Sequence, residues 1–209
     1  MGTTTATTTG RILDSAETLF FTDGIAVTGV DRVADAAGVA IATLYKHVGS
    51  KDRLLSAVLA RRLASWTEHW DAAIDAAESP IGRLLAIFDA LASFRRTAGT
   101  TQWCCFLATA SERPRLPGTD TDPVYQLIEQ DTLLVTQRLQ ELATEAALED
   151  PATVASRLLL IYNGVLSSLL RGAPADPLPL AHHLAELVVD PSGRLLHRTA
   201  AEALQVRDR

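Results

Sequence analysis

The side chains best suited to chemistry in this sequence are four hydrogen-bonding groups within five residues: Thr43, Tyr45, Lys46 and His47. They supply a hydroxyl, a phenol, an ammonium and an imidazole, and each can donate to a phosphate oxygen or a base edge. The chain has two lysines in all, and the second, Lys51, follows five residues after the first. Because the net charge is −6, there is no broad basic field. Any nucleic acid must therefore be met by these few local cations.

The apolar residues around this cluster predict two short helices joined by a tight turn. Val30–Ala37 carries small and apolar side chains at helical spacing, and a second helix is expected over Ala42–His47. Gly38 suits the left-handed conformation of a sharp turn, and Ser50 suits the cap of the long helix that follows. This pattern is typical of a helix-turn-helix, whose second helix enters the major groove of DNA. A plain helical hairpin has the same pattern, so spacing alone leaves both interpretations open.

A set of short motifs between Arg11 and Leu55, about a quarter of the chain, decides between the two. The motifs are Phe20-Phe21 before Gly24, Val33-Ala34, Ala37-Gly38-Val39, Thr43-Leu44-Tyr45-Lys46-His47, and Ser50-Lys51 before Leu54-Leu55. With these motifs the segment resembles the N-terminal domain of TetR-type transcriptional regulators, and Cys105–Glu112 is similar to the sixth helix of one branch of that family. The resemblance implies a dimeric repressor that binds a palindromic operator and is released by a small apolar or aromatic effector.

Three positions depart from the usual pattern of the family. Gly29 stands where relatives usually carry Ser or Thr, Ala40 where they usually carry Ser, and Ile41 where the residue is often cationic or polar. The first two positions cap helices and touch phosphate in the family, so these departures should weaken affinity or alter base preference. Ile41 could instead contact a thymine methyl group. The residues expected to contact DNA are Thr28, Gly29, Ala40, Ile41, Ala42, Thr43, Tyr45, Lys46, His47 and Lys51.

The rest of the chain predicts an all-α protein. Ala and Leu dominate, aromatic residues make up 5%, and no segment alternates with the period of a strand. Residues 1–10 are expected to form a disordered arm, residues 11–56 the DNA-binding domain, and residues 57–209 a helical ligand-binding and dimerisation domain. The expected helices are 11–22, 30–37, 42–47, 51–77, 80–99, 103–112, 123–148, 151–171 and 180–189, with a loop over 113–121, a proline-rich linker over 174–179 and a short helix after Ser192.

Several classes of function find no support in the sequence. No Gly-rich phosphate loop, nucleophile elbow or other catalytic signature occurs, so neither an enzyme nor a cofactor is predicted. The adjacent His182 and His183 would point about 100° apart on a helix, and they do not predict a metal site. No apolar run is long enough for a membrane span and no export signal occurs, so a cytoplasmic protein is expected. Cys104 and Cys105 are either small buried hydrophobes or a redox sensor.

The helices after residue 57 hold two further sets of candidates. In the family the fourth to seventh helices enclose the effector pocket, although core packing explains each aromatic residue here more simply. The apolar segment 158–170 would be covered either by a partner subunit or by the core of its own chain. The effector candidates are Leu63, Trp66, Trp70, Phe88, Arg95, Trp103, Phe106 and Tyr125, with Arg95 at the polar end. The candidates for a homodimer interface are Leu158, Tyr162, Val165, Leu166, Leu169 and Leu184.

Three functions stay open on this evidence. The first is a ligand-responsive, DNA-binding repressor. The second is a helical small-molecule binding protein or enzyme with a vestigial helix-turn-helix, supported by the departures at Gly29, Ala40 and Ile41 and by the acidic net charge. The third is a dimerisation module without a ligand. Salt-dependent binding to DNA would separate the first from the others, and thermal stabilisation by a compound would exclude the third.

Overall fold

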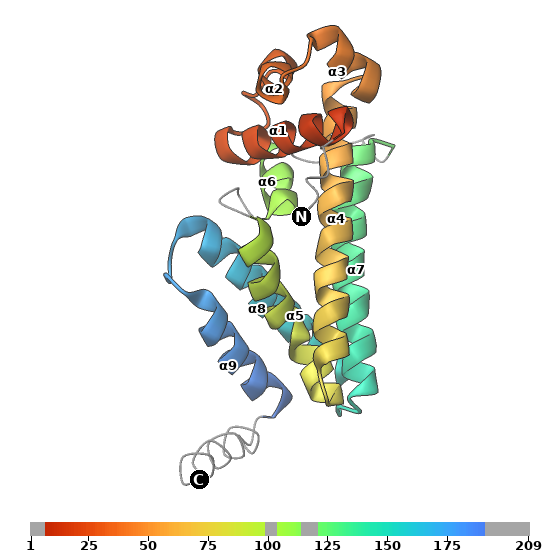
Figure 1. The fold of residues 1–209 in the computed structure, drawn as a ribbon. Helices are drawn as coiled ribbons and strands as arrows, with labels where there is room; N and C mark the ends of the chain where they lie inside the picture. Colours follow the sequence, from red (N-terminus) through yellow and green to blue (C-terminus); the bar gives the residue numbers. More distant parts are fainter. Residues whose placement is uncertain (1–6, 99–103, 114–120, 191–209) are drawn as a thin grey trace, which may run out of the picture. The chain divides into compact units, whose positions relative to one another are not determined.

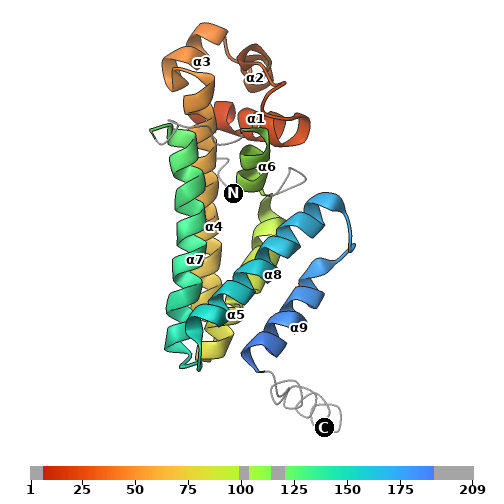
Figure 2. The ribbon, with the colours of Figure 1, turned by 180° about the vertical axis from the view of Figure 1, so that it is seen from behind.

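The computed structural model of the chain describes residues 7–98, 104–113 and 121–190. Their regular structure is helical throughout, and no strand occurs among them (Figures 1 and 2). The predicted all-α class is therefore confirmed. The helices are α1 (Thr8–Asp23), α2 (Val30–Ala37), α3 (Ile41–Val48), α4 (Lys51–Ala76), α5 (Pro80–Ala98), α6 (Cys105–Glu112), α7 (Pro123–Glu145), α8 (Pro151–Arg171) and α9 (Pro177–Val189).

The capping residues explain where several of these helices begin and end. Gly38 takes the left-handed conformation after α2, with φ 64°, as the turn prediction requires. The Ser50 hydroxyl accepts a hydrogen bond from the Arg53 backbone N–H at 3.1 Å. The Asp150 carboxylate accepts one from the Thr153 backbone N–H at 3.1 Å. Each side chain satisfies a helix N–H that has no partner within the helix, so α4 and α8 begin where the sequence predicts.

Two helices begin three residues earlier than the sequence indicates. The expected arm over residues 1–10 is wrong for residues 8–10, because α1 starts at Thr8 with the Thr7 hydroxyl accepting from the Gly10 backbone N–H at 3.0 Å. The expected linker over 174–179 is wrong in its second half, because α9 starts at Pro177. Proline fits the first helical turn, where its missing N–H costs no hydrogen bond. Residues 1–6 and the helix expected after Ser192 lie outside the described residues.

By its internal packing the chain divides into two compact units. The first comprises the described residues up to Thr67 together with those in Arg95–Thr132, and the second comprises Glu68–Phe94 and the described residues from Leu133 onward. Helices α4, α5 and α7 each contribute residues to both units. The division predicted between residues 56 and 57 follows the DNA-binding motif rather than packing, and it stays a prediction.

Each unit has its own apolar core. In the first, α1 packs on α2 and α2 on α3. In the second, α8 lies alongside α9 (Figures 1 and 2). Burial of these side chains is the main favourable contribution to folding. The fully buried residues include Ile12, Phe20, Phe21, Leu44, Leu54 and Leu55 in the first unit, and Trp70, Leu84, Ile87, Leu139, Leu158 and Ala185 in the second.

Candidate nucleic-acid interface

Helices α2 and α3 are held together by a few small side chains and by their turn. Val33, Ala34 and Ala37 are buried on α2, and Leu44 is fully buried on α3. The turn is closed by two backbone hydrogen bonds, from Gly38 to the Asp35 carbonyl and from Val39 to the Ala34 carbonyl, both 3.0 Å long. With its single buried leucine facing α2, α3 leaves most of its other side chains in solvent.

The solvent-facing side of α3 carries most of the residues predicted to meet DNA. Ile41 and Tyr45 are exposed to 46% and 45%, and Lys46 is also exposed. Lys46 has no hydrogen bond or ion pair with any residue that the structure describes. His47 is exposed as well, but its Nδ1 lies 3.0 Å from the Thr9 hydroxyl on α1. The donor cluster predicted from the sequence therefore gathers on one short helix, with Lys46 as its uncommitted cation.

The start of α3 is open. The helix-capping position is Ala40, which has no side chain to accept a hydrogen bond. The first backbone hydrogen bonds of the helix are those donated by Thr43 and Leu44 to the Ala40 carbonyl, at 2.9 and 3.1 Å. No acceptor among the described residues meets the backbone N–H groups of Ile41 and Ala42. Free N–H groups at the positive end of a helix favour a phosphate.

The start of α2 differs, because a carboxylate covers it. Its capping position is Gly29, again without a side-chain hydrogen bond. A Cβ atom added at Gly29 would collide with the carboxylate of Asp31, so that carboxylate occupies the space that a Ser or Thr side chain would need. A negative charge is favourable at a helix N-terminus and unfavourable beside a phosphate. The glycine at position 29, where the family usually has Ser or Thr, therefore leaves room for the Asp31 carboxylate.

Thr28 is wrong as a side-chain contact to DNA. It is fully buried, and its hydroxyl lies 2.7 Å from the Gly24 carbonyl and 3.2 Å from the Leu19 carbonyl. Buried hydroxyls need such partners, and Thr28 finds them at the end of α1. The sequence gives no sign of this, because a threonine before a helix start looks the same whether it faces solvent or the preceding helix.

Lys51 also has an internal role. It is half-buried, its ammonium donates to the Ala26 carbonyl at 3.3 Å, and it lies 6.0 Å from the centre of the Phe20 ring. The lysine therefore helps to hold the segment between α1 and α2. Of the two lysines, Lys46 is the one with no internal role among the described residues.

Known proteins share this arrangement of helices. Residues 12–58 match the family model described as "Bacterial regulatory proteins, tetR family". The chain is 28% identical over 177 residues to the HTH-type transcriptional regulator YjdC of Escherichia coli (strain K12), covering 84% of this chain and 90% of the relative. It is 34% identical over 85 residues to the HTH-type transcriptional repressor KstR2 of Mycolicibacterium smegmatis, covering 40% of each chain. The chain belongs to the TetR family.

Solved structures agree with this fold. A TetR-family transcriptional regulator from Streptomyces coelicolor is similar with a TM-score of 0.76 at 23% identity, over 87% of this chain and 94% of that one. The match to the TetR model covers the helix-turn-helix and the start of α4. The protein is accordingly a helix-turn-helix transcriptional regulator, as the motifs of the sequence predict.

In this TetR-family chain, the end of α6 contacts the DNA-binding motif. The sequence did not predict this contact. The Glu112 carboxylate accepts a hydrogen bond from the Ala26 backbone N–H at 2.9 Å. Arg113 forms ion pairs with Asp52 at 2.6 Å and with Asp122 at 3.0 Å, and its carbonyl accepts from the Tyr125 hydroxyl at 3.0 Å. These contacts, here called the α6 clasp, lie within the first unit. Their partners are far apart in sequence, so no local pattern could predict them.

A second polar network joins α1 to α4 within the first unit. Arg61 pairs with Asp14 and with Glu17, both at 2.6 Å, and Arg62 pairs with Glu17 at 3.1 Å. Arg62 is buried, so its ion pair meets little solvent screening. The orientation of α1 beneath the helix-turn-helix is therefore fixed by charge as well as by apolar packing.

The effector candidates are divided between the two units. Leu63, Trp66 and Phe106 are buried in the first unit, where Arg95 and Tyr125 are half-buried, whereas Trp70 and Phe88 are buried in the second. Trp103 lies outside the described residues. Tyr125 is already committed to the α6 clasp.

The thiols of Cys104 and Cys105 are poorly suited to redox chemistry. Burial raises the pKa of Cys104 to about 12 and raises the pKa of Cys105 well above its usual range. The reactive form of a cysteine is the thiolate. At neutral pH both groups stay protonated, which favours the interpretation of the pair as small packing side chains, with Cys105 buried and Cys104 half-buried.

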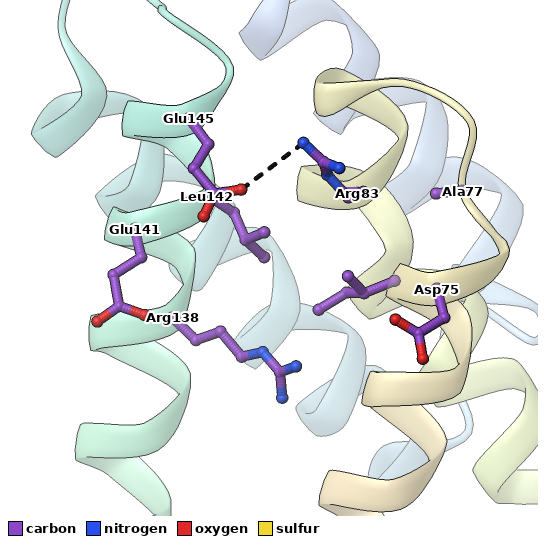
Figure 3. Close-up of a pocket in the computed structure, with 8 residues that line it drawn as sticks. Asp75, Ala77, Arg83, Arg138, Glu141, Leu142 and Glu145 are labelled. Carbon is purple, nitrogen blue, oxygen red and sulfur yellow. Dashed lines mark ion pairs between the residues drawn. The ribbon is translucent and has the colours of Figure 1, made fainter.

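A cavity of about 450 Å³ lies in the second unit, among the ends of α4 and α7 and the start of α5 (Figure 3). Its lining is mostly charged, and Arg83 faces Glu145 across it at 3.7 Å. Arg138 pairs with Asp71 and lies 4.7 Å from the centre of the Trp70 ring. None of the predicted effector residues lines this cavity. The lining residues are Ile74, Asp75, Ala77, Arg83, Arg138, Glu141, Leu142 and Glu145.

The predicted dimer interface needs correction. Leu158, Tyr162, Val165 and Leu166 are buried within the chain itself, because these residues form the inward face of α8. Leu169 is half-buried, and Leu184 is 42% exposed. The exposed leucines of α8 and α9 are here called the leucine face, and they are Leu160 at 73%, Leu170 at 49%, Leu180 at 51%, Leu184 at 42% and Leu187 at 37%.

The composition of α8 also satisfies a length and hydropathy criterion for a membrane span, with a third of the tested window buried. Helices packed inside soluble proteins meet the same criterion, so this is weak evidence for a membrane. A helix that is apolar on every side needs cover on every side. Helix α9 packs against part of α8, while Leu160 and Leu170 on α8 stay exposed.

Proposed function

We propose that this regulator is a cytoplasmic repressor that binds a palindromic operator as a homodimer and releases it when a small apolar or aromatic effector binds. The observation that carries the proposal is the outward side of α3, with exposed Tyr45, uncommitted Lys46 and open N–H groups at Ile41 and Ala42. A cation and free backbone donors on one helix suit phosphates, and the neighbouring side chains suit base edges.

The leucine face supports the homodimer. Five leucines are exposed on two adjacent helices, and exposed apolar side chains that gather in one area mark an interaction site. A two-fold axis would place this surface against its own copy, so that each contact between the subunits occurs twice. Two recognition helices about 34–36 Å apart would then reach successive major grooves, and the operator would be palindromic.

The α6 clasp supports regulation by an effector. Phe106 and Glu112 lie on the same short helix, and the Glu112 carboxylate is bonded directly to the Ala26 backbone in front of α2. An effector that contacts α6 near Phe106 would displace this carboxylate and loosen the position of α2 and α3. Binding of effector and operator would then be coupled, and each would weaken the other by the same factor.

The deciding experiment is DNA binding by the purified protein. Fluorescent fragments of the region upstream of its own gene are titrated at several salt concentrations, with a scrambled fragment as control. We expect specific binding in the nanomolar range or tighter, with an affinity that falls steeply with salt. Equal binding of both fragments would refute operator recognition, and absence of binding would refute the proposal.

The effector is tested by thermal stabilisation against a set of apolar and aromatic compounds. A compound that raises the melting temperature is then titrated into the protein with and without operator. We expect the operator to weaken its binding by roughly 5- to 150-fold, the usual range for coupled sites. Equal affinity in both titrations would exclude that compound as the regulator.

A vestigial helix-turn-helix on a small-molecule binding protein or enzyme is the second candidate. The observation that favours it is the Asp31 carboxylate over the start of α2, which opposes a phosphate there. It predicts stabilisation by a compound together with no preference for any DNA fragment, so the two experiments above separate the candidates.

A further inference from the structure

The first residue of α3 is apolar, exposed and unsupported by any polar neighbour. Ile41 is 46% exposed, and the residues on either side of it, Ala40 and Ala42, are also exposed and carry only methyl groups. Thr43, the first hydroxyl along the helix, is half-buried. The start of α3 therefore has no exposed side chain that could hydrogen-bond a base edge.

An apolar side chain at the start of a recognition helix selects bases by contact with their apolar groups, whereas a polar side chain selects them by hydrogen bonds. In the major groove, thymine presents a methyl group, whereas cytosine presents an N–H donor at the adjacent position. An isoleucine against the methyl group removes apolar surface from water on both partners. The same side chain against cytosine would bury a donor with no acceptor, which is unfavourable.

Tyr45 extends this apolar surface along the helix. It lies four residues after Ile41, so both project from the same side of α3, and its exposure of 45% is nearly the same. Lys46 follows Tyr45 in sequence and lies on an adjacent side of the helix. The Ile41 side chain and the Tyr45 ring thus form a stripe for base edges, and the cation beside it suits the phosphate backbone.

We propose that Ile41 is a specificity-determining residue that reads the 5-methyl group of one thymine in each operator half-site. The proposal rests on the proposed operator binding, and it adds the class of base that the start of α3 selects. The N-terminal residues of a recognition helix are the ones that meet base edges, so Ile41 is placed to make this contact.

The test replaces operator thymines by deoxyuridine, which removes the methyl group and keeps the base pair. In a fragment that the protein binds specifically, each symmetry-related pair of thymines is replaced in turn, and the dissociation constant is measured. At one pair we expect affinity to fall about fourfold per half-site, the effect of one buried methyl group, and roughly fifteenfold for both.

Ile41→Ala shows whether isoleucine is responsible. Because Ile41 is exposed, the variant should fold normally, and circular dichroism checks this directly. We expect Ile41→Ala to bind thymine and uracil operators equally, because its methyl-reading group is gone. Lys46→Ala is the matched control, and it should weaken both operators by the same factor and keep the difference between them.

The outcomes separate this inference from the proposed function. If no fragment is bound specifically, operator recognition itself is refuted, and the inference with it. If specific binding is unaffected by uracil at every thymine pair, Ile41 does not read a methyl group. If Ile41→Ala still distinguishes thymine from uracil, another residue reads it, and the assignment to Ile41 is overturned.

Discussion

The helix-turn-helix and the α8–α9 pair treat their surfaces in opposite ways. In the helix-turn-helix most charged side chains are bound to the chain itself: Arg11 donates to the Ala37 carbonyl at 3.1 Å, and Lys51 to the Ala26 carbonyl. Lys46 and a few neighbours on α3 stay available, as does the exposed Arg53 in the first turn of α4. On α8 and α9 the situation is reversed, because leucines are left in solvent. The groups that each surface leaves in solvent thus indicate its partner. The donors on α3 suit a charged, hydrogen-bonding polymer, and the leucines of α8 and α9 suit another apolar surface.

The strongest test of this comparison is a charge on the leucine face. Leu184→Arg should raise the dimer dissociation constant by at least about a hundredfold, because a two-fold contact would bury two unpaired guanidinium groups. Sedimentation equilibrium measures the change. Leu133→Arg is the matched control, since Leu133 is 47% exposed on α7. If only the control dissociates the dimer, the interface includes α7 and excludes the leucine face.

The two lysines test the contrast between available and committed cations. Lys46→Ala should weaken operator binding about tenfold and flatten its salt dependence by roughly one unit for each phosphate that the lysine neutralises, without changing the free energy of unfolding. Lys51→Ala should lower the free energy of unfolding in addition to weakening operator binding, because the variant cannot form the hydrogen bond to the Ala26 carbonyl. Fluorescence titration and urea denaturation of both variants give the comparison. Equal stability losses in the two variants would contradict it.

The α6 clasp tests whether the helix-turn-helix depends on internal ion pairs. Arg113→Ala should lower the free energy of unfolding by about 1 kcal/mol, since it removes two part-exposed ion pairs. Arg32→Ala removes the Arg32–Asp23 pair, where Arg32 is 55% exposed, and should cost no more than about 0.5 kcal/mol. Urea denaturation with matched slopes compares them. A larger loss in Arg32→Ala would show that the clasp is not a stabilising contact.

Asp131, in the first unit, should make the stability of the chain depend on pH. Burial raises the pKa of its carboxyl group from 3.8 to about 7. Between these values the folded chain holds a proton that the unfolded chain has lost, so this contribution to stability declines as pH rises from about 4 to about 7 and then stays constant. Asp131→Asn should therefore raise the melting temperature more at pH 8 than at pH 5. The expected scale is about 2–4 °C per kcal/mol for a chain of this size. An equal rise at both pH values would exclude titration of Asp131.

The smallest expected effect concerns the carboxylate over α2. Asp31→Asn should strengthen operator binding about twofold at low salt, because a negative charge next to the phosphates is removed. Asp35→Asn, on the exposed far end of α2, is the control and should change affinity less. The gain should disappear at high salt. A loss of affinity on Asp31→Asn would show that the carboxylate supports the binding conformation.

The sequence predicted the helix-turn-helix well because its signals are local. Gly38 and Ser50 each act within one turn of their own position, and the structure has them in the predicted roles. Thr28 was misjudged, and the ion pairs of Arg113 were missed, because their partners lie on other segments. For α8 the pattern was apolar on all sides, so it gave no basis for assigning Leu158 to the core and Leu160 to the surface. That division depends on where α9 packs.

The collision between a side chain at Gly29 and the Asp31 carboxylate makes the order of mutations matter. A Gly29→Ser substitution would force the carboxylate to swing away, and the new hydroxyl would take over the start of α2. In that background Asp31→Asn should have little left to change, so the two substitutions are epistatic rather than additive. A lineage that acquires serine at 29 first would thus be released from selection on the charge at 31, whereas a lineage that keeps glycine would not.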